Sequence, residues 1–425
     1  MSRSLIAIMS SSSTQTQVLD QSTYHLLSES GEYITFRDGW QTIRCVALSE
    51  SSSSDSEGSV EVPTVLESLE TLEFLGFTPE AGKNILERFE NALDLIEDPC
   101  ILDYAKGHVR SVPDVGCPDD DWNSAMLAMG ITQTLCNKIL DPEFTDLRLT
   151  QNARYWVIDT IEAKFLFLTT LNANVLGSKL SDQGPVSLQA RLERSKKFSG
   201  TNSQTQKQKA EWDPQPQIQT SAVPQATSFT ELLLLKGGDC GRLQKAIRLD
   251  TDLTDVNRIE NVRSTPPGDF AGAAMALYFT KQRQVAYQYA TYAKTRLRTA
   301  GEDPIAVGIL EVVIPRELTT GSVEIYGETW QEFVWNHRLQ RPTPDHLRWI
   351  DEAPMVMGPV VTCSPDKFRK LVHNGIDHKA LEPLKLAGDE SASQYFLRDA
   401  ELMRQINEQG RFQIETLSYS SATAK

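Results

Sequence analysis

Polar residues that could do chemistry stand at the ends of two short apolar runs. Lys236 and Gly237 end the run LLLLKGG, and Tyr278 and Thr280 end the run MALYFT, after which the sequence changes to a helical period. A tyrosine ring offers a flat face to a planar or cationic group, and a lysine contacts a phosphate as a point charge. These four residues are therefore the first candidates for a binding site.

Motifs that point strongly to one reaction are absent from the sequence. It contains no Walker loop and no GxGxxG, HExxH or GxSxG motif. His373 and His378 are the one close histidine pair, but their spacing across a glycine fits neither face of a helix nor of a strand, and no acidic or cysteine partner completes a metal set. The pattern predicts no metal site.

The order of several weak motifs resembles a poorly characterised ADP-ribosyltransferase-like family that has bacterial members and longer fungal relatives. The matching blocks, in chain order, are LLLLKGG (232–238), ALYFT (276–280), QVAYQYATYAK (284–294), IAVGILEVVIP (305–315), TWQEFVWNHR (329–338) and MVMGPVV (355–361). The resemblance covers about residues 229–365. It implies a split-sheet domain that binds NAD, cleaves it as a transferase or glycohydrolase, and passes ADP-ribose to an acceptor.

In that family the nicotinamide end of NAD lies in a split between two small sheets, where an aromatic residue at a strand end faces it. The resemblance implies that Tyr278 stacks on the nicotinamide ring and that Thr280 holds a ribose. There is a simpler alternative for each residue. Tyr278 could be a core residue at a strand end, and Thr280 could be the N-cap of a helix over residues 281–297.

The first strand of the family typically ends with a histidine or an arginine followed by a glycine, which holds a ribose or a phosphate. This chain has Lys236 and Gly237 at that place. A lysine lacks the planar fork of arginine and the neutral donor and acceptor of histidine. The departure counts against transferase activity. The alternative is a strand end that puts a charge into water before a glycine turn.

Cleavage of the nicotinamide bond generates a sugar cation, so a carboxylate must face the ribose. Glu332 is the candidate. On a strand it would share one face with Trp330 and Val334; if Thr329 instead opens a helix through a capping box, Glu332 would only close the helix start. Both alternatives stay open. The other candidate acids are Asp351, Glu352 and Glu328.

Composition and charge indicate a folded intracellular protein. Hydrophobic residues make up 40% and charged residues 23% of the 425 residues, and the formal net charge is −15. That charge disfavours nucleic acid and anionic membrane surfaces, which attract clustered lysine and arginine. The six cysteines include no CxxC pair, and no apolar stretch approaches the ~20 residues that span a bilayer. We expect a cytoplasmic or nuclear protein.

The chain divides into parts by composition, and the predicted fold class is a multidomain α+β protein. The expected parts are a low-complexity region with a β-hairpin at Asp38–Gly39 (1–61), an all-α helical module (62–198), a flexible linker (199–228), a mixed α+β split-sheet ADP-ribosyltransferase-like domain (229–418) and a disordered tail (419–425). Within the helical module, Thr78 and Pro79 predict a helix start.

The C-terminal part is expected to contain strands at its four apolar runs, TELLLLKGG, MALYFT, IAVGILEVVIP and APMVMGPVVT. Its end predicts a helix over residues 394–407 and a short strand over residues 412–417. The tyrosines at 287, 289 and 292 are expected to pack a helix onto a sheet.

Two functions follow from these patterns. One is an NAD-cleaving enzyme in which Glu332 orients the ribose, Tyr278 stacks the nicotinamide, and Lys236 lies near the phosphates. The other is a non-catalytic scaffold whose helical module binds a protein partner. Lys236, where histidine or arginine is usual, and the helix-like pattern of TWQE favour the scaffold.

Overall fold

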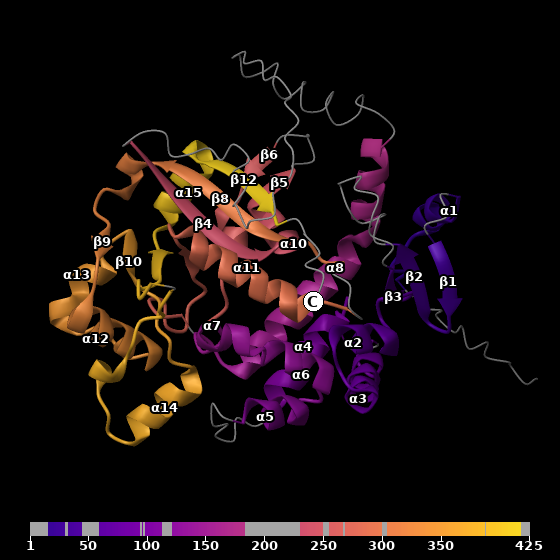
Figure 1. Cartoon of the computed structure of the whole chain (residues 1–425), viewed down its shortest axis with the longest axis horizontal. Helices are drawn as coiled ribbons and strands as arrows, with labels where there is room; N and C mark the ends of the chain where they lie inside the picture. Colours follow the sequence, from indigo (N-terminus) through magenta and orange to yellow (C-terminus); the bar gives the residue numbers. More distant parts are fainter. Residues whose placement is uncertain are drawn as a thin grey trace, which may run out of the picture.

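The computed structural model describes most of the chain, as Figure 1 shows. The described residues are 16–29, 33–44, 59–93, 96, 98–112, 121–182, 230–249, 255–266, 268–299, 304–386 and 388–417. The predicted linker (199–228) and tail (419–425) lie outside them, as does much of the predicted low-complexity region. None of the described helices combines the length and the apolar character needed to cross a bilayer.

A small antiparallel sheet stands near the N-terminus. Helix α1 (Gln21–Glu29) precedes its strands β1 (Tyr33–Arg37), β2 (Trp40–Arg44) and β3 (Ser59–Pro63), which pair in the order β1-β2-β3. Asp38 and Gly39 form the turn between β1 and β2, and Gly39 has φ of 75°. Because β1 and β2 pair antiparallel across this turn, the predicted hairpin is confirmed. Gly39 suits the turn, since glycine adopts positive φ without steric cost.

The next part is helical. Its helices are α2 (Leu69–Leu75), α3 (Pro79–Glu90), α4 (Ile101–Ser111), α5 (Trp122–Ala128), α6 (Gln133–Ile139), α7 (Thr145–Arg148) and α8 (Ala153–Asp182). Thr78 caps α3 by accepting a hydrogen bond from the backbone N–H of Ala81, and Pro79 is the first helical residue, as predicted. Ile85 and Phe89 of α3 are buried one turn apart.

The C-terminal part is mixed α and β. Its strands are β4 (Glu231–Asp239), β5 (Ile247–Leu249), β6 (Asp255–Asn257), β7 (Leu277–Phe279), β8 (Val307–Pro315), β9 (Val323–Glu324), β10 (Met355–Pro359), β11 (Ser393–Leu397) and β12 (Arg411–Thr416). Two sheets, β7-β11-β10-β9 and β12-β8-β4, carry the fold, and β5 pairs with β6. All four strands predicted from apolar runs are present as β4, β7, β8 and β10.

A backbone bridge links the two larger sheets. Leu235 of β4 and Thr280, one residue past β7, exchange backbone hydrogen bonds of 2.7 and 2.8 Å. Beyond this bridge β4 and β7 form no further ladder. Backbone hydrogen bonds therefore join the sheets at this bridge, and buried side chains of both sheets, such as Leu310 and Met357, pack in one cluster.

Helices cover both faces of the sheet β12-β8-β4. Residues 307–314 of β8 are all buried, as expected for a strand covered on both sides. On one face Ile309 packs with Ala286 of α11 (Arg283–Leu297). On the other, Leu310 lies in a cluster with Ile406 of α15 (Ala400–Gln409). The remaining helices, α10 (Cys240–Leu243), α12 (Gly327–Arg338), α13 (Arg348–Asp351) and α14 (Pro365–His373), lie around the sheets.

The predicted helix over residues 394–407 is wrong in its first part. Residues 393–397 form β11, which pairs with β7 on one side and β10 on the other, and helix α15 begins only at Ala400. Pairing on both edges satisfies the backbone of β11, and this tertiary constraint outweighs helical propensity. The predicted strand near residue 412 is confirmed as β12.

The helical part and the C-terminal part share one hydrophobic core. Tyr292 of α11 is fully buried, and its ring lies 5.0 Å from that of Phe144 and 4.9 Å from that of Trp156 in α8. Its hydroxyl donates a hydrogen bond of 2.8 Å to the carbonyl of Ile139 in α6. A helix of the C-terminal part is thus packed into the interior of the helical part.

Candidate functional site

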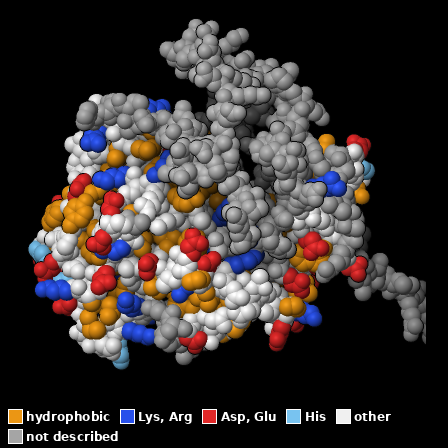
Figure 2. Space-filling model, in the orientation of Figure 1, with side chains coloured by type: hydrophobic (Ala, Val, Ile, Leu, Met, Phe, Trp, Pro, Cys, Tyr) orange, Lys and Arg blue, Asp and Glu red, His pale blue; other side chains and the backbone are white. Residues whose placement is uncertain are grey.

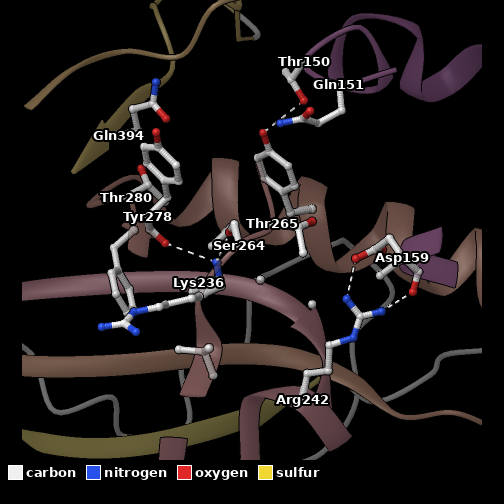
Figure 3. A pocket seen from close by; sticks show the side chains of 18 of the residues that line it. Thr150, Gln151, Asp159, Lys236, Arg242, Ser264, Thr265, Tyr278, Thr280 and Gln394 are labelled. Atoms are coloured by element: carbon white, nitrogen blue, oxygen red, sulfur yellow. Dashed lines mark hydrogen bonds and ion pairs between the residues drawn. The ribbon is translucent and has the colours of Figure 1, made fainter. Parts of the chain in front are cut away.

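A cavity of about 410 Å³ lies beside the bridge between the C-terminal sheets and borders the helical part (Figure 3). Four of the five residues selected from the sequence line it: Lys236, Gly237, Tyr278 and Thr280. Lys236 and Gly237 come from β4, while Tyr278 and Thr280 come from β7 and the residue just beyond it. The predicted strand end at Lys236–Gly237 is wrong, because β4 continues to Asp239 through its pairing with β8. The bridge between Leu235 and Thr280 holds β4 and the end of β7 together.

Lys236 points into the cavity toward β7. Its Nζ donates hydrogen bonds to Ser264 Oγ (3.2 Å) and to the carbonyl oxygen of Tyr278 (3.3 Å), as Figure 3 shows. Burial lowers the pKa of Lys236 to about 8, although the charge of Asp159 acts in the opposite direction. Lys236 is therefore a cation whose direct partners are neutral.

Tyr278 is at once a packed side chain and a cavity wall. Its ring lies 5.4 Å from the ring of Phe396 and 6.4 Å from that of Phe270, and its hydroxyl accepts a hydrogen bond of 2.9 Å from the backbone N–H of Phe270. A Cβ on Gly268 would lie 2.5 Å from that hydroxyl. Burial raises the pKa of Tyr278. The core and the cavity interpretations of Tyr278 are thus compatible.

Thr280 and Gly237 have structural roles beside their place in the cavity wall. Thr280 Oγ1 accepts a hydrogen bond of 3.0 Å from the backbone N–H of Gln282, the residue before α11, which starts two residues later than predicted. A Cβ on Gly237 would lie only 1.8 Å from the carbonyl oxygen of Ala286. The glycine is therefore required by the packing of α11 on β4.

Glu332 lies outside this cavity, on helix α12. The strand alternative for this segment is wrong, and so is the capping box at Thr329, because the helix begins at Gly327 with Tyr326 as N-cap. Trp330 and Phe333 of this helix are buried. The Glu332 carboxylate lies 3.0 Å from His346 Nε2.

The other acids considered from the sequence do not line the cavity either. Asp351 pairs with Arg398 at 2.7 Å, and Glu328 pairs with Lys379 at 3.0 Å. Glu352 lies beside Asp351 at the end of α13 and is exposed. None of the three meets Tyr278 across the cavity.

Different carboxylates line the cavity, and each is already paired with a cation. Asp159 pairs with Arg242 and with Arg296 (2.8 Å). The remaining pairs are Asp239 with Arg242 (3.1 Å), Glu162 with Lys106 (3.2 Å) and Asp269 with Arg338 (2.6 Å). Burial by itself would raise the pKa of Asp159, but the charges of Arg242 and Arg296 outweigh it and lower the pKa to about 2.

Gln394 is the polar side chain next to the Tyr278 ring in Figure 3. It is buried, and its Nε2 donates to Asp269 Oδ2 (2.7 Å) and to the carbonyl of Pro359 (3.1 Å). The backbone N–H of Val361 also donates to Asp269 (3.2 Å). Gln394 was not among the predicted site residues, because its segment was predicted to be a helix. The neighbouring aromatic residues Tyr395 and Phe396, which are common in strands, were the available signal for a strand.

The cavity is locally positive although the whole chain is acidic. Among the cations that line it, the half-buried Lys236 and the exposed Lys245 and Arg263 form no ion pair with a carboxylate of the described residues. Arg263 donates to the Sδ of Met403. The face shown in Figure 2 carries acidic and basic side chains interspersed in its described part. Uncompensated cations in a partly enclosed site favour an anionic ligand.

The described residues contain no cluster of three histidine, cysteine or acidic side chains that could hold a metal ion. No family model matches the chain, and neither a curated protein nor a solved structure matches it.

Proposed function

We propose that this protein has an ADP-ribosyltransferase-like domain that binds NAD in the cavity between its two sheets. One observation carries the proposal. Two pairs of residues chosen from sequence alone, Lys236–Gly237 within β4 and Tyr278–Thr280 at the end of β7, line one cavity beside a backbone bridge. A binding site formed by a separation of two small sheets is what the family resemblance implies.

The chemistry of the cavity residues suits a nucleotide ligand. A volume of about 410 Å³ lies within the range of roughly 300–1,000 Å³ that is usual for small-molecule sites. Tyr278 supplies an aromatic wall suited to a planar ring. Lys236, Lys245 and Arg263 supply positive charge for the pyrophosphate.

We propose that the protein binds NAD in this cavity and cleaves it slowly or not at all. Stabilising a sugar cation requires a carboxylate whose charge is free to face it. Asp269, the acid joined to Gln394 beside Tyr278, already receives hydrogen bonds from Arg338, Gln394 and Val361. Its charge is directed into the protein. This pairing supports the non-catalytic function over transfer of ADP-ribose.

Calorimetric titration of the full chain with NAD tests the proposal. We expect saturable binding, weakened roughly tenfold in Lys236→Met because a charged contact to phosphate is lost. Lys385→Met is the matched control, since Lys385 is exposed and lies outside the cavity. Its affinity for NAD should equal that of the native chain.

Two results would overturn parts of this proposal. An absence of both binding heat and an NAD-dependent thermal shift removes the NAD site. Chromatographic detection of multiple-turnover nicotinamide release by the native chain removes the claim that cleavage is slow, and restores the transferase or glycohydrolase function.

A further inference from the structure

We infer that the helical part supplies the wall that holds the adenosine end of the dinucleotide, with Tyr155 of α8 as the ring on which the base stacks. This inference rests on the proposed function. It gives the helical part a role inside the ligand site, in addition to any protein partner it binds.

The cavity crosses from the sheets to the helical part. Tyr278 and Gln394 lie on one side of the view in Figure 3, Thr150 and Asp159 lie on the other, and Lys236 lies between them. A dinucleotide that spans the cavity, with its nicotinamide at Tyr278 and its phosphates near Lys236, places its adenosine at α8.

Tyr155 is suited to a base at that end. It is half-buried, lines the cavity, and forms no hydrogen bond through its hydroxyl to another described residue. Its ring meets Trp156 edge-on, with centroids 5.0 Å apart and an interplanar angle of 89°. Tyr289 of α11 lines the same cavity, and its hydroxyl lies 3.5 Å from Thr150 Oγ1. Aromatic side chains of this kind stack on nucleobases.

Ion pairs fix this wall to the C-terminal part. Asp159, one turn after Tyr155 on α8, pairs with both Arg242 and Arg296. The Arg296 guanidinium lies 4.8 Å from the ring of Trp156 and 4.7 Å from that of Tyr292, and its side chain is almost completely buried. Because the wall is held before any ligand arrives, little ordering is needed on binding.

Titrations with the two halves of NAD distinguish this inference from the proposed function. The probes are NAD, AMP and nicotinamide mononucleotide, titrated against the full chain, Tyr155→Leu and the control Tyr104→Leu. Tyr104 is a half-buried tyrosine of α4 that packs on Phe89, away from the cavity. We expect Tyr155→Leu to lower the affinities for NAD and for AMP by roughly tenfold each and to leave the affinity for nicotinamide mononucleotide unchanged.

The outcomes divide cleanly. Equal weakening of both half-ligands by Tyr155→Leu, or of neither, overturns the adenosine wall while NAD binding stands. If the chain binds AMP through Tyr155 but binds neither NAD nor nicotinamide mononucleotide, the adenosine wall is supported and the proposed function is refuted. A native chain that binds none of the probes overturns both. Tyr104→Leu should match the native chain throughout.

Discussion

Among the described residues, Lys236 has no carboxylate partner. Its Nζ donates to the hydroxyl of Ser264 and to the carbonyl of Tyr278, and burial brings its pKa to about 8, below its ordinary value of 10.5. An ammonium held in this way is easily neutralised unless an anion compensates it. Lys236 therefore gives the cavity a charge that changes at a pH close to neutral.

NAD affinity should therefore fall as the pH rises through 8. Below that pH Lys236 is already protonated and meets the phosphates as a cation. Above it, binding must take up a proton, so the affinity falls by up to about tenfold per pH unit. Calorimetric titrations at pH 7 to 9.5 measure this slope. Lys236→Arg, which keeps its charge over the whole range, should flatten it, and an equal slope in both proteins would exclude Lys236 as its source.

At the scale of elements, the contact of α11 with β4 decides the shape of the cavity. Gly237 lets the helix backbone approach the strand so closely that a Cβ would lie 1.8 Å from the carbonyl oxygen of Ala286. Backbone atoms cannot turn aside as a flexible side chain can. The strand and the helix would have to separate, and both line the cavity.

Gly237→Ala should lower the free energy of unfolding by about 3 kcal/mol or more, because overpacking here acts on backbone. Urea denaturation measures the change. Gly107 is the matched control: it lies inside α4 with no atom near an added Cβ, so Gly107→Ala should raise stability by about 0.5–1 kcal/mol. A neutral effect of Gly237→Ala would show that α11 and β4 are further apart than described.

Two elements show where sequence patterns were insufficient. The segment TWQEFVW fits both a strand and a helix over its few residues, and burial of Trp330 and Phe333 against the core selects the helix. The segment SQYFL becomes strand β11 because β7 and β10 lie on either side of it. Both choices depend on neighbours distant in sequence, which local propensity does not record.

At the scale of the whole molecule, the helical and C-terminal parts behave as one packing unit. A single cluster of buried side chains contains Trp122 and Trp156 from the helical part and Tyr292, Leu297 and Val307 from the C-terminal part. The ion pair between Asp159 and Arg242 also crosses from one part to the other. Separation of the parts would expose an aromatic interior and break a buried network of charges.

Thermal unfolding of the full chain should therefore give one transition, with far-ultraviolet circular dichroism and tryptophan fluorescence changing together. Tyr292→Ala should shift both signals to lower temperature by the same amount, since it removes a fully buried ring from the shared core. Two transitions with different midpoints, of which Tyr292→Ala moves only one, would mean that the parts unfold independently.

The sequence alone determined the elements whose signals are local: the Asp38–Gly39 turn, the capped start of α3, and the apolar runs of β4, β7, β8 and β10. Chain order and periodicity act over a few residues, so one sequence suffices for them. Tertiary structure decided which acid meets which cation, and it placed Gln394 and Asp269 at the cavity while keeping Glu332 away. It also made α8 a wall of the site. Such placements depend on packing between segments more than 100 residues apart, such as Asp159 and Arg296, and no short pattern in the chain encodes that packing.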